Sequence, residues 1–481
     1  MKTKSVGILI SLLLIVGSCT GKRNGNLTIE KKNSLDEYVR SAMEIHHIPG
    51  LAVAVVKDGN VIYENYLGNA TLEEESPVDN KTIFRVFSTT KLITATGIFQ
   101  LVEKGKISLE DKISKHFDSL PEAWEQVRVK HLLTHSSGLP DLRYPRHLSN
   151  AEVMQELFND KMDFQTGNQF RYNQTNYWLL ARIIEKTTRL SFDAYVLKNQ
   201  FAASKEGVLF SSDSREEIHN RATRYYYDAS KNEFRKDTIN VGKRGHPGNG
   251  LNISLNEFVA WNRRLNNGEL IREKAKLHMW TPFQFANSED EFLHGWGSYA
   301  VSGKTSYGFT GGNLSAFRKF VADDLTIIVL SNGYKHPGYD IIVNDLSKLI
   351  FPMEGDADLL LEQQVMKLVL EKKYADAKTR YAQIRLQDPS YDFDNLRWNI
   401  NSIGNTFLRS DDIEEACSVY QLNAEVNSKW WVALASYAEG LEKKGDVARA
   451  LQFYEKAIQL NTDNAYNYNP FMTDKIDQLK K

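Results

Sequence analysis

The chain has only two cysteines in 481 residues, Cys19 and Cys417. So few cysteines exclude a disulfide-stapled scaffold. Charge of one sign is lacking too, because 60 basic residues face 61 acidic ones and the net charge is −1. Without a basic excess there is no electrostatic footprint for nucleic acid, so we expect no nucleic-acid partner. Eleven prolines and 29 glycines are too few for long disordered linkers.

A hydrophobic run long enough to cross a bilayer is also missing. The extended apolar run from Gly7 to Gly17 has about eleven residues, against the roughly 20 that a spanning helix needs. Lys2 and Lys4 precede it, and it ends in Val16-Gly17-Ser18-Cys19, a layout typical of a signal peptide. Small residues before a cysteine resemble the bacterial lipobox. We therefore predict a lipoprotein signal peptide over residues 1–19 with lipidation at Cys19; a plain signal peptide with an incidental cysteine is the alternative.

This interpretation implies an exported protein of the bacterial cell envelope. Its only membrane attachment would be the lipid anchor, followed by a polar tether over residues 20–33. The length predicts two or three domains in total.

Residues 34–352 read as an α+β domain with an antiparallel sheet flanked by helices. Asp58-Gly59 between two β-rich runs is a strong hairpin signal. Because further strand candidates come near residue 300 and beyond, we expect the sheet to combine strands from both ends of the domain. The expected helices cover residues 34–46, 90–104, 177–185 and 341–350, and the expected strands cover 51–56, 61–66, 295–301, 315–321 and 326–330.

Residues 356–481 read as entirely helical and repetitive. Ala416 and Ala450 are 34 residues apart, and each is followed four residues later by a tyrosine. This spacing resembles that of the tetratricopeptide repeat, in which small residues let two helices approach. We predict three repeat-like hairpins that could recruit a protein partner, and few contacts to the preceding domain; a generic helical bundle is the alternative.

Ser88-Thr-Thr-Lys91 stands before an apolar helical stretch. Serine is a favoured N-cap, so Ser88 could simply cap the helix. However, a cation in the first turn opposes the helix dipole, which makes Lys91 a poor choice for capping. Three residues apart, both side chains would share one face within hydrogen-bond reach. A desolvated lysine amine could then accept the serine proton.

Further motifs follow in order and together resemble the serine β-lactamase and penicillin-binding-protein superfamily, nearest its class C and esterase-like branch. The resemblance covers roughly residues 34–350 and implies a β-lactamase/transpeptidase-like fold with a helical subdomain. The stretches that carry it are Phe84–Lys91, Leu101–Lys112, His131–Asp141, Phe170–Tyr177, Gly248–Leu251 and Tyr307–Gly312.

The resemblance also implies roles for individual residues. Ser88 would be the acylated nucleophile and Lys91 its proton acceptor. Tyr172 would be a shared general base or acid, although an ordinary buried tyrosine is the alternative. Backbone N–H groups of Ser88 and Gly312 would form the oxyanion hole, with Gly311 beside them.

Two positions depart from the family pattern. The asparagine of the family's Tyr-x-Asn is Gln174 here, one methylene longer. The third motif, which usually begins with Lys or His, begins with Phe309, so the group that would meet a substrate carboxylate is lost. We therefore expect a serine hydrolase that forms an acyl-enzyme with an ester or amide, including peptide-like or cell-wall-derived substrates.

Alternatives to this function remain open: a catalytically degenerate binding scaffold, or a true β-lactamase or D-Ala carboxypeptidase. No cofactor is needed for this chemistry. His131 and His135 stand four apart, but no Glu follows His131 as a metalloprotease helix requires and no third ligand is evident, so we expect no metal.

Overall fold

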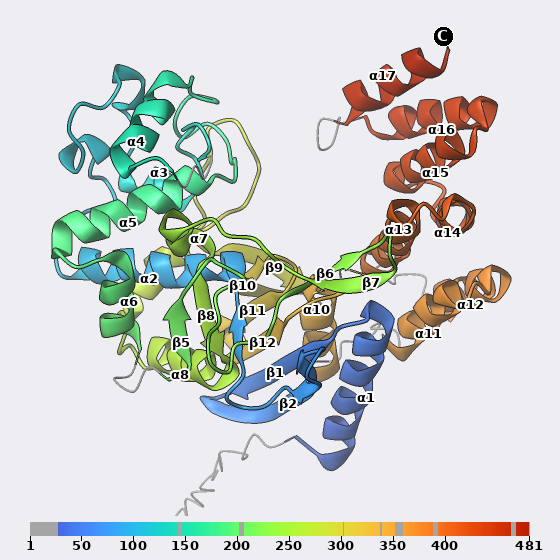
Figure 1. The fold of residues 1–481 in the computed structure, drawn as a ribbon, viewed down its shortest axis with the longest axis horizontal. Helices are drawn as coiled ribbons and strands as arrows, with labels where there is room; N and C mark the ends of the chain where they lie inside the picture. The colour runs from blue at the N-terminus through green and yellow to red at the C-terminus, as the bar shows by residue number, and fades with distance from the viewer. Residues whose placement is uncertain are drawn as a thin grey trace, which may run out of the picture.

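The computed structural model describes residues 27–142, 147–201, 206–301, 303–336, 339–351, 359–387, 393–462 and 468–480. Its centre is a seven-stranded antiparallel sheet in the order β3-β2-β1-β12-β11-β10-β9 (Figure 1). The sheet joins strands from both ends of the domain, as expected from the sequence. Its strands are β1 (Gly50–Lys57), β2 (Asn60–Thr71), β3 (Ser76–Pro77), β9 (Gly297–Val301), β10 (Lys304–Gly311), β11 (Ser315–Phe320) and β12 (Leu325–Ser331).

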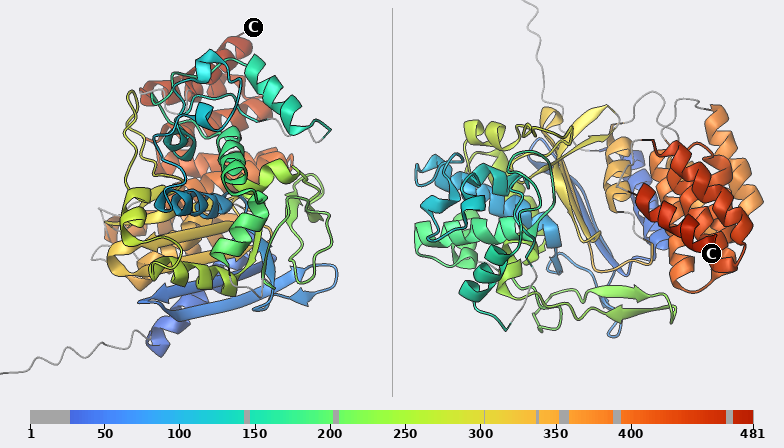
Figure 2. Two further views of the ribbon diagram at one scale, coloured as in Figure 1. Left: turned by 90° about the vertical axis from the view of Figure 1, so that its left-hand side faces the viewer. Right: turned by 90° about the horizontal axis from the view of Figure 1, so that it is seen from above.

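Alternating side chains of the central strands enter two separate cores. Leu51, Val53 and Val55 of β1 pack with α1 (Ile29–His46) and α10 (Tyr339–Ile350). Ala52 and its alternate neighbours pack on the opposite face, against α2 (Thr90–Glu103) and α8 (Leu255–Asn266). Seen from above in Figure 2, the sheet stands between these two helical layers. The two-residue period of a strand produces this division.

Helix α1 begins earlier than the sequence suggested. It starts at Ile29 inside the predicted tether, because the Thr28 side chain accepts a hydrogen bond from the N–H of Lys31 and caps the helix. The hairpin at Asp58-Gly59 is confirmed, and both residues have positive φ. Cys19 and the apolar run before it lie outside the described residues. No helix in the described part of the chain is both long enough and apolar enough to cross a membrane.

A helical lobe and two small sheets complete this domain. The sheet β4-β8-β5 lies beside α2, and β6 and β7 form a separate hairpin. The bounds are α3 (Val129–Leu133), α4 (Asn150–Asn159), α5 (Gln174–Thr188), α6 (Phe192–Gln200), α7 (His246–Asn249), α9 (Glu273–Met279), β4 (Ile83–Arg85), β5 (Val208–Phe210), β6 (Tyr225–Asp228), β7 (Glu233–Lys236) and β8 (Leu251–Ser254).

The C-terminal region is all helical. Consecutive helices pair as α11/α12, α13/α14 and α15/α16, and α17 packs on the last pair (Figure 1). Gly404 of α13 lies so close to the Tyr420 ring that a Cβ there would be 2.4 Å from Cε1. The helices are α11 (Leu359–Leu370), α12 (Tyr374–Gln387), α13 (Asp394–Arg409), α14 (Ile413–Val426), α15 (Trp431–Lys444), α16 (Val447–Leu460) and α17 (Asn469–Leu479).

Contacts between this helical region and the sheet domain are more extensive than we expected from the sequence. Ile45 of α1 belongs to the same apolar cluster as Val365 and Met366 of α11. Gln363 Nε2 donates to the carbonyl oxygen of Tyr38, at 3.3 Å. The first repeat-like helix therefore packs directly on α1.

Candidate active site

Ser88 lies in a short 3₁₀ turn, η1 (Phe87–Thr89), immediately before α2. Phe87 has φ +46°, a left-handed conformation that a bulky residue rarely adopts and that surrounding structure must enforce. The Oγ1 of Thr89 is 2.8 Å from the Oγ of Ser315, which ties the turn to strand β11. The turn is therefore fixed while the Ser88 hydroxyl remains half-buried.

Tyr172 contacts the predicted nucleophile directly. Its hydroxyl donates to Ser88 Oγ at 2.8 Å. Tyr172 stands just before α5, and Asn173 caps that helix by accepting from the N–H of Asn176. The structure thus brings together two residues that are 84 positions apart in the sequence.

Lys91 is completely buried beside this pair. Its Nζ donates to the carbonyl oxygen of Gly248 at 2.9 Å and to Oε1 of Gln174 at 3.3 Å. It also lies 4.7 Å from the centre of the Tyr172 ring. Among the described residues, none of its hydrogen bonds goes to Ser88, because Ser88 belongs to the preceding turn rather than to the helix. Tyr172 lies near both residues, because its hydroxyl donates to Ser88 Oγ and its ring is beside Lys91 Nζ.

Gln174 and Gly248 form the polar cage of Lys91. The side chain of Gln174, which departs from the asparagine of the family pattern, contacts the lysine directly. A Cβ at Gly248 would lie 2.7 Å from Gln174 Oε1 and 3.2 Å from Lys91 Nζ. A larger residue here would make the Gln174 amide shift from its present position beside the lysine. The sequence resemblance included Gly248 but assigned it no role.

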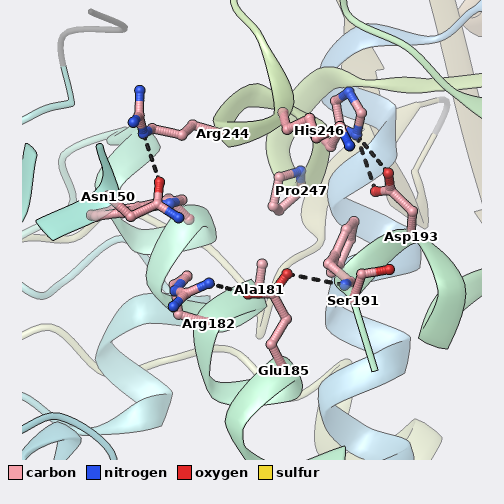
Figure 3. A pocket seen from close by; sticks show the side chains of 12 residues that line it. Asn150, Ala181, Arg182, Glu185, Ser191, Asp193, Arg244, His246 and Pro247 are labelled. Atoms are coloured by element: carbon pink, nitrogen blue, oxygen red, sulfur yellow. Dashed lines mark hydrogen bonds and ion pairs between the residues drawn. The ribbon is translucent and has the colours of Figure 1, made fainter. Parts of the chain in front are cut away.

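Helix α7, which carries Gly248, is held from its other side. His246 Nδ1 donates to Oδ2 of Asp193 at 2.9 Å, at the edge of a pocket of about 190 Å³ (Figure 3). The carbonyl oxygen of Pro247 accepts from Thr94 Oγ1 at 2.6 Å. These contacts fix the carbonyl group that receives the Lys91 hydrogen bond.

Gly311 and Gly312 lie beside η1, the turn that carries Ser88. A Cβ at Gly311 would come within 2.0 Å of the Val86 carbonyl oxygen and 2.9 Å of the Ser88 nitrogen. Gly312 has φ +57° and follows the last residue pair of the β10–β11 ladder. The two predicted oxyanion-hole segments therefore approach one another as closely as backbone allows.

Phe309 is buried in an aromatic wall beside the site. Its ring centre is 6.3 Å from that of Tyr172, 6.2 Å from that of Phe292 and 5.9 Å from Lys91 Nζ. The adjacent Thr310 hydroxyl accepts from the buried Arg318, whose guanidinium also pairs with Asp340. The guanidinium of Arg318 therefore already has protein partners and does not replace the cation that is missing at Phe309.

His135 supports Tyr172 from below, a role that the sequence did not suggest. Its ring centre is 4.6 Å from that of Tyr172, and its Nδ1 accepts from the N–H of Asn173 at 3.1 Å. Burial and the nearby Lys91 charge hold the His135 pKa well below its usual value. The imidazole is therefore neutral, and its ring packs against the phenol at an interplanar angle of 36°. Its φ of +54° was not foreseeable from the motif alone.

His131 is used structurally, since its Nδ1 accepts from the N–H of Arg128 at 3.1 Å. Across the described ranges, no three His, Cys, Asp or Glu side chains gather as metal ligands would.

Comparison with known proteins adds a family to this geometry. A sequence model described as Beta-lactamase matches residues 35–350. Penicillin-binding protein 4* of Bacillus subtilis (strain 168) is 27% identical over 287 residues, which cover 55% of this chain and 63% of that protein. The chain thus spans less than two thirds of that relative's length.

Solved structures share the fold at lower identity. The octameric penicillin-binding protein homologue from Pyrococcus abyssi aligns with a TM-score of 0.60 at 22% identity, over 70% of this chain and 81% of that one. D-amino acid amidase from Ochrobactrum anthropi SV3, solved with D-phenylalanine, aligns with a TM-score of 0.56 at 18% identity, over 67% and 97%.

Proposed function

Since the chain belongs to the beta-lactamase family, we propose that it is a serine acyl-hydrolase in which Ser88 is acylated by an ester or amide. The observation that carries this proposal is the 2.8 Å hydrogen bond between the Tyr172 hydroxyl and Ser88 Oγ. A nucleophilic serine needs a neighbouring group that can take its proton, and Tyr172 is the group in contact.

The Tyr172 hydroxyl donates to Ser88 Oγ in the structure, and the proton route that we propose begins once this phenol has lost its proton. Tyr172 in its phenolate form would accept the Ser88 proton as Oγ attacks the carbonyl carbon. The buried ammonium of Lys91, 4.7 Å from the phenol ring, would stabilise that phenolate. Collapse of the tetrahedral intermediate would release the alcohol or amine, which takes the proton from Tyr172. Water would then attack the acyl-enzyme by the same route in reverse.

The oxyanion of the intermediate would lie between the η1 turn and the end of β10. Donors there would be the N–H groups of Ser88 and Gly312, whose segments are in contact. Preorganised backbone donors of this kind typically contribute 10²–10³ in rate.

The substrate we propose is neutral beside its reacting carbonyl. Phe309, Phe292 and the Tyr172 ring form an apolar wall where a cation would otherwise meet a carboxylate. An aryl or alkyl group gains free energy by packing there, whereas a carboxylate would lose its hydration without a partner. Esters and amides with a hydrophobic group beside the carbonyl fit this requirement.

A covalent probe tests the proposal. Separate samples of the full-length protein are incubated with a fluorophosphonate, with p-nitrophenyl butyrate and with D-phenylalanine amide. We expect stoichiometric labelling and turnover of at least one substrate, both abolished by Ser88→Ala and retained by Ser230→Ala, an exposed serine in the same domain. Labelling that survives in Ser88→Ala, or a protein that is neither labelled nor active, would contradict the proposal and favour a binding scaffold.

A further inference from the structure

A second pocket, of about 180 Å³, lies where the sheet domain meets the helical repeats. It is enclosed by β6 and its turn, by the residues after β12, and by α13. Figure 1 shows the β6–β7 hairpin reaching across to α13. The pocket contains three cations, Arg224, Lys335 and Arg409, and tyrosines 225–227, with no acidic residue among its lining side chains.

Two of the three cations have no counter-charge. Arg224 pairs with Asp237 at 2.6 Å. Lys335 donates only to Asn232 Oδ1, at 3.4 Å, and lies 4.7 Å over the Tyr227 ring. Arg409 donates to an oxygen of its own helix, the Asn405 carbonyl, and to Thr406 Oγ1. Within the described residues, neither Lys335 nor Arg409 forms an ion pair.

His336 lies beside these cations, and their charge lowers its pKa. It is buried, and its Nδ1 is 3.0 Å from Thr406 Oγ1, whereas its Nε2 has no hydrogen-bond partner in the described part of the chain. Burial holds its pKa well below the usual value, and the neighbouring His46, His47, Lys335 and Arg409 lower that pKa further. In the part of the chain that the structure describes, no carboxylate forms an ion pair with either of these two cations.

The pocket is linked to the η1 turn, which carries Ser88, through the side chain of Phe87. The Arg224 guanidinium is 5.0 Å from the centre of the Phe87 ring. Phe87 directly precedes Ser88, and its ring fills the space next to Gly312, where a Cβ would be 2.9 Å from Cγ. A ligand held here would therefore lie next to the layer that supports the proposed active site.

We propose that this pocket binds a carboxylate- or phosphate-bearing ligand whose ring packs on the tyrosines of β6. Lys335 and Arg409 supply the charge, and the repeat helices complete the site, because Arg409 comes from α13. Carboxylates and phosphates are the anions that a guanidinium recognises in bidentate fashion. The binding itself is independent of whether Ser88 is catalytic.

Calorimetric titration of the full-length protein at low ionic strength tests this site. The probes are inorganic phosphate, phenyl phosphate and phenylacetate, with benzyl alcohol as the uncharged control. We expect saturable binding of at least one ring-bearing anion, tighter than inorganic phosphate, and weakened by added salt. The comparison of phenyl phosphate with phenylacetate identifies the preferred anionic group.

Variants locate the binding. Lys335→Gln and Arg409→Gln remove cations without breaking an ion pair, so both variants should fold, which circular dichroism checks. Each should raise the Kd several-fold and the double variant at least tenfold, whereas Lys443→Gln, an exposed unpaired cation elsewhere in the repeats, should leave it unchanged. Absence of saturable anion binding, or an unchanged Kd in the folded double variant, would overturn the proposal.

Discussion

At the residue scale, the reactivity proposed for Ser88 depends on the single phenol that contacts its hydroxyl. Tyr172 in turn depends on its neighbours: Lys91 Nζ lies 4.7 Å from its ring centre, and the His135 ring centre lies 4.6 Å from it. The motif in the sequence predicted Ser88, Lys91 and Tyr172 as a group. It could not predict that Ser88 contacts Tyr172 while Lys91 donates to Gln174 and Gly248, because these contacts depend on segments far apart in the sequence.

Tyr172→Phe tests this arrangement by removing one oxygen atom. We expect kcat/KM for p-nitrophenyl butyrate to fall by about 10²–10⁴, the usual contribution of a general base, with little change in melting temperature. Steady-state kinetics measure the effect. Tyr66→Phe removes a phenol that contacts Asn256 at the surface and serves as the control. Activity retained in Tyr172→Phe would assign the base elsewhere.

Phe309 allows a test of substrate preference. A histidine at this position would place a polar, chargeable group beside Tyr172, so we expect Phe309→His to raise acylation by a chromogenic cephalosporin relative to ester turnover. A tenfold change in that ratio corresponds to about 1.4 kcal/mol of differential binding. Because a polar side chain replaces a buried ring, the ratio rather than either rate is the measurement. An unchanged ratio would show that other groups set the preference.

At the element scale, the site combines the 3₁₀ turn η1 and the start of α2 with the start of α5, helix α7 and the end of β10. The hairpin at Asp58-Gly59 was predictable because its turn residues have an explicit signature. Strand β10 was not, since it contains glycines that strands usually avoid. The structure supplies the reason at Gly308, where a Cβ would lie 1.7 Å from the Phe317 carbonyl oxygen. Strand propensities of single residues do not include this need for close backbone approach, so they do not predict the strand.

Gly248→Ala tests how far the position of α7 matters to Lys91. The added Cβ would press on Gln174 Oε1 at 2.7 Å and on Lys91 Nζ at 3.2 Å. We expect kcat to fall at least tenfold, while circular dichroism stays native. Gly97→Ala makes the same change in α2, where the nearest atom is a side-chain nitrogen at 3.3 Å, and should leave kcat within about twofold. Equal effects of both changes would argue against a specific role for Gly248.

At the scale of the whole molecule, we propose that the sheet domain is anchored by its N-terminus and extended by its helical repeats. The lipid at Cys19 is a prediction from sequence alone. If it is correct, Cys19→Ser should move the protein from the membrane fraction to the soluble fraction with kcat unchanged, as fractionation and an ester assay would measure. One acyl chain holds a protein only marginally, so firm membrane association would require the multiple chains of a lipoprotein. Membrane association that persists in Cys19→Ser would contradict the anchor.

The repeats should stabilise the sheet domain, which the sequence pattern did not reveal. The 34-residue spacing is visible in the sequence, but it does not indicate which face of the repeats packs on the sheet domain. Ile45 of α1 is buried against Val365 and Met366 of α11. Exposing one such side chain costs roughly 1.5–3 kcal/mol, so a chain that ends at Met353 should melt at a lower temperature than the full chain.

The last prediction tests whether the repeats stabilise the sheet domain by packing on it or are only joined to it by the chain. In the full-length protein, Ile45→Ala should lower the free energy of unfolding by roughly 2–5 kcal/mol, because the cavity forms between the two parts. Ile29→Ala shortens an isoleucine of the same helix that is 80% exposed, so it should change stability by less than about 0.5 kcal/mol. Chemical denaturation followed by circular dichroism gives both values. In the chain that ends at Met353, Ile45 is already exposed, so Ile45→Ala should lose most of its effect there. An equal cost in both chains would place Ile45 in the core of the sheet domain alone and leave the repeats as a separable unit.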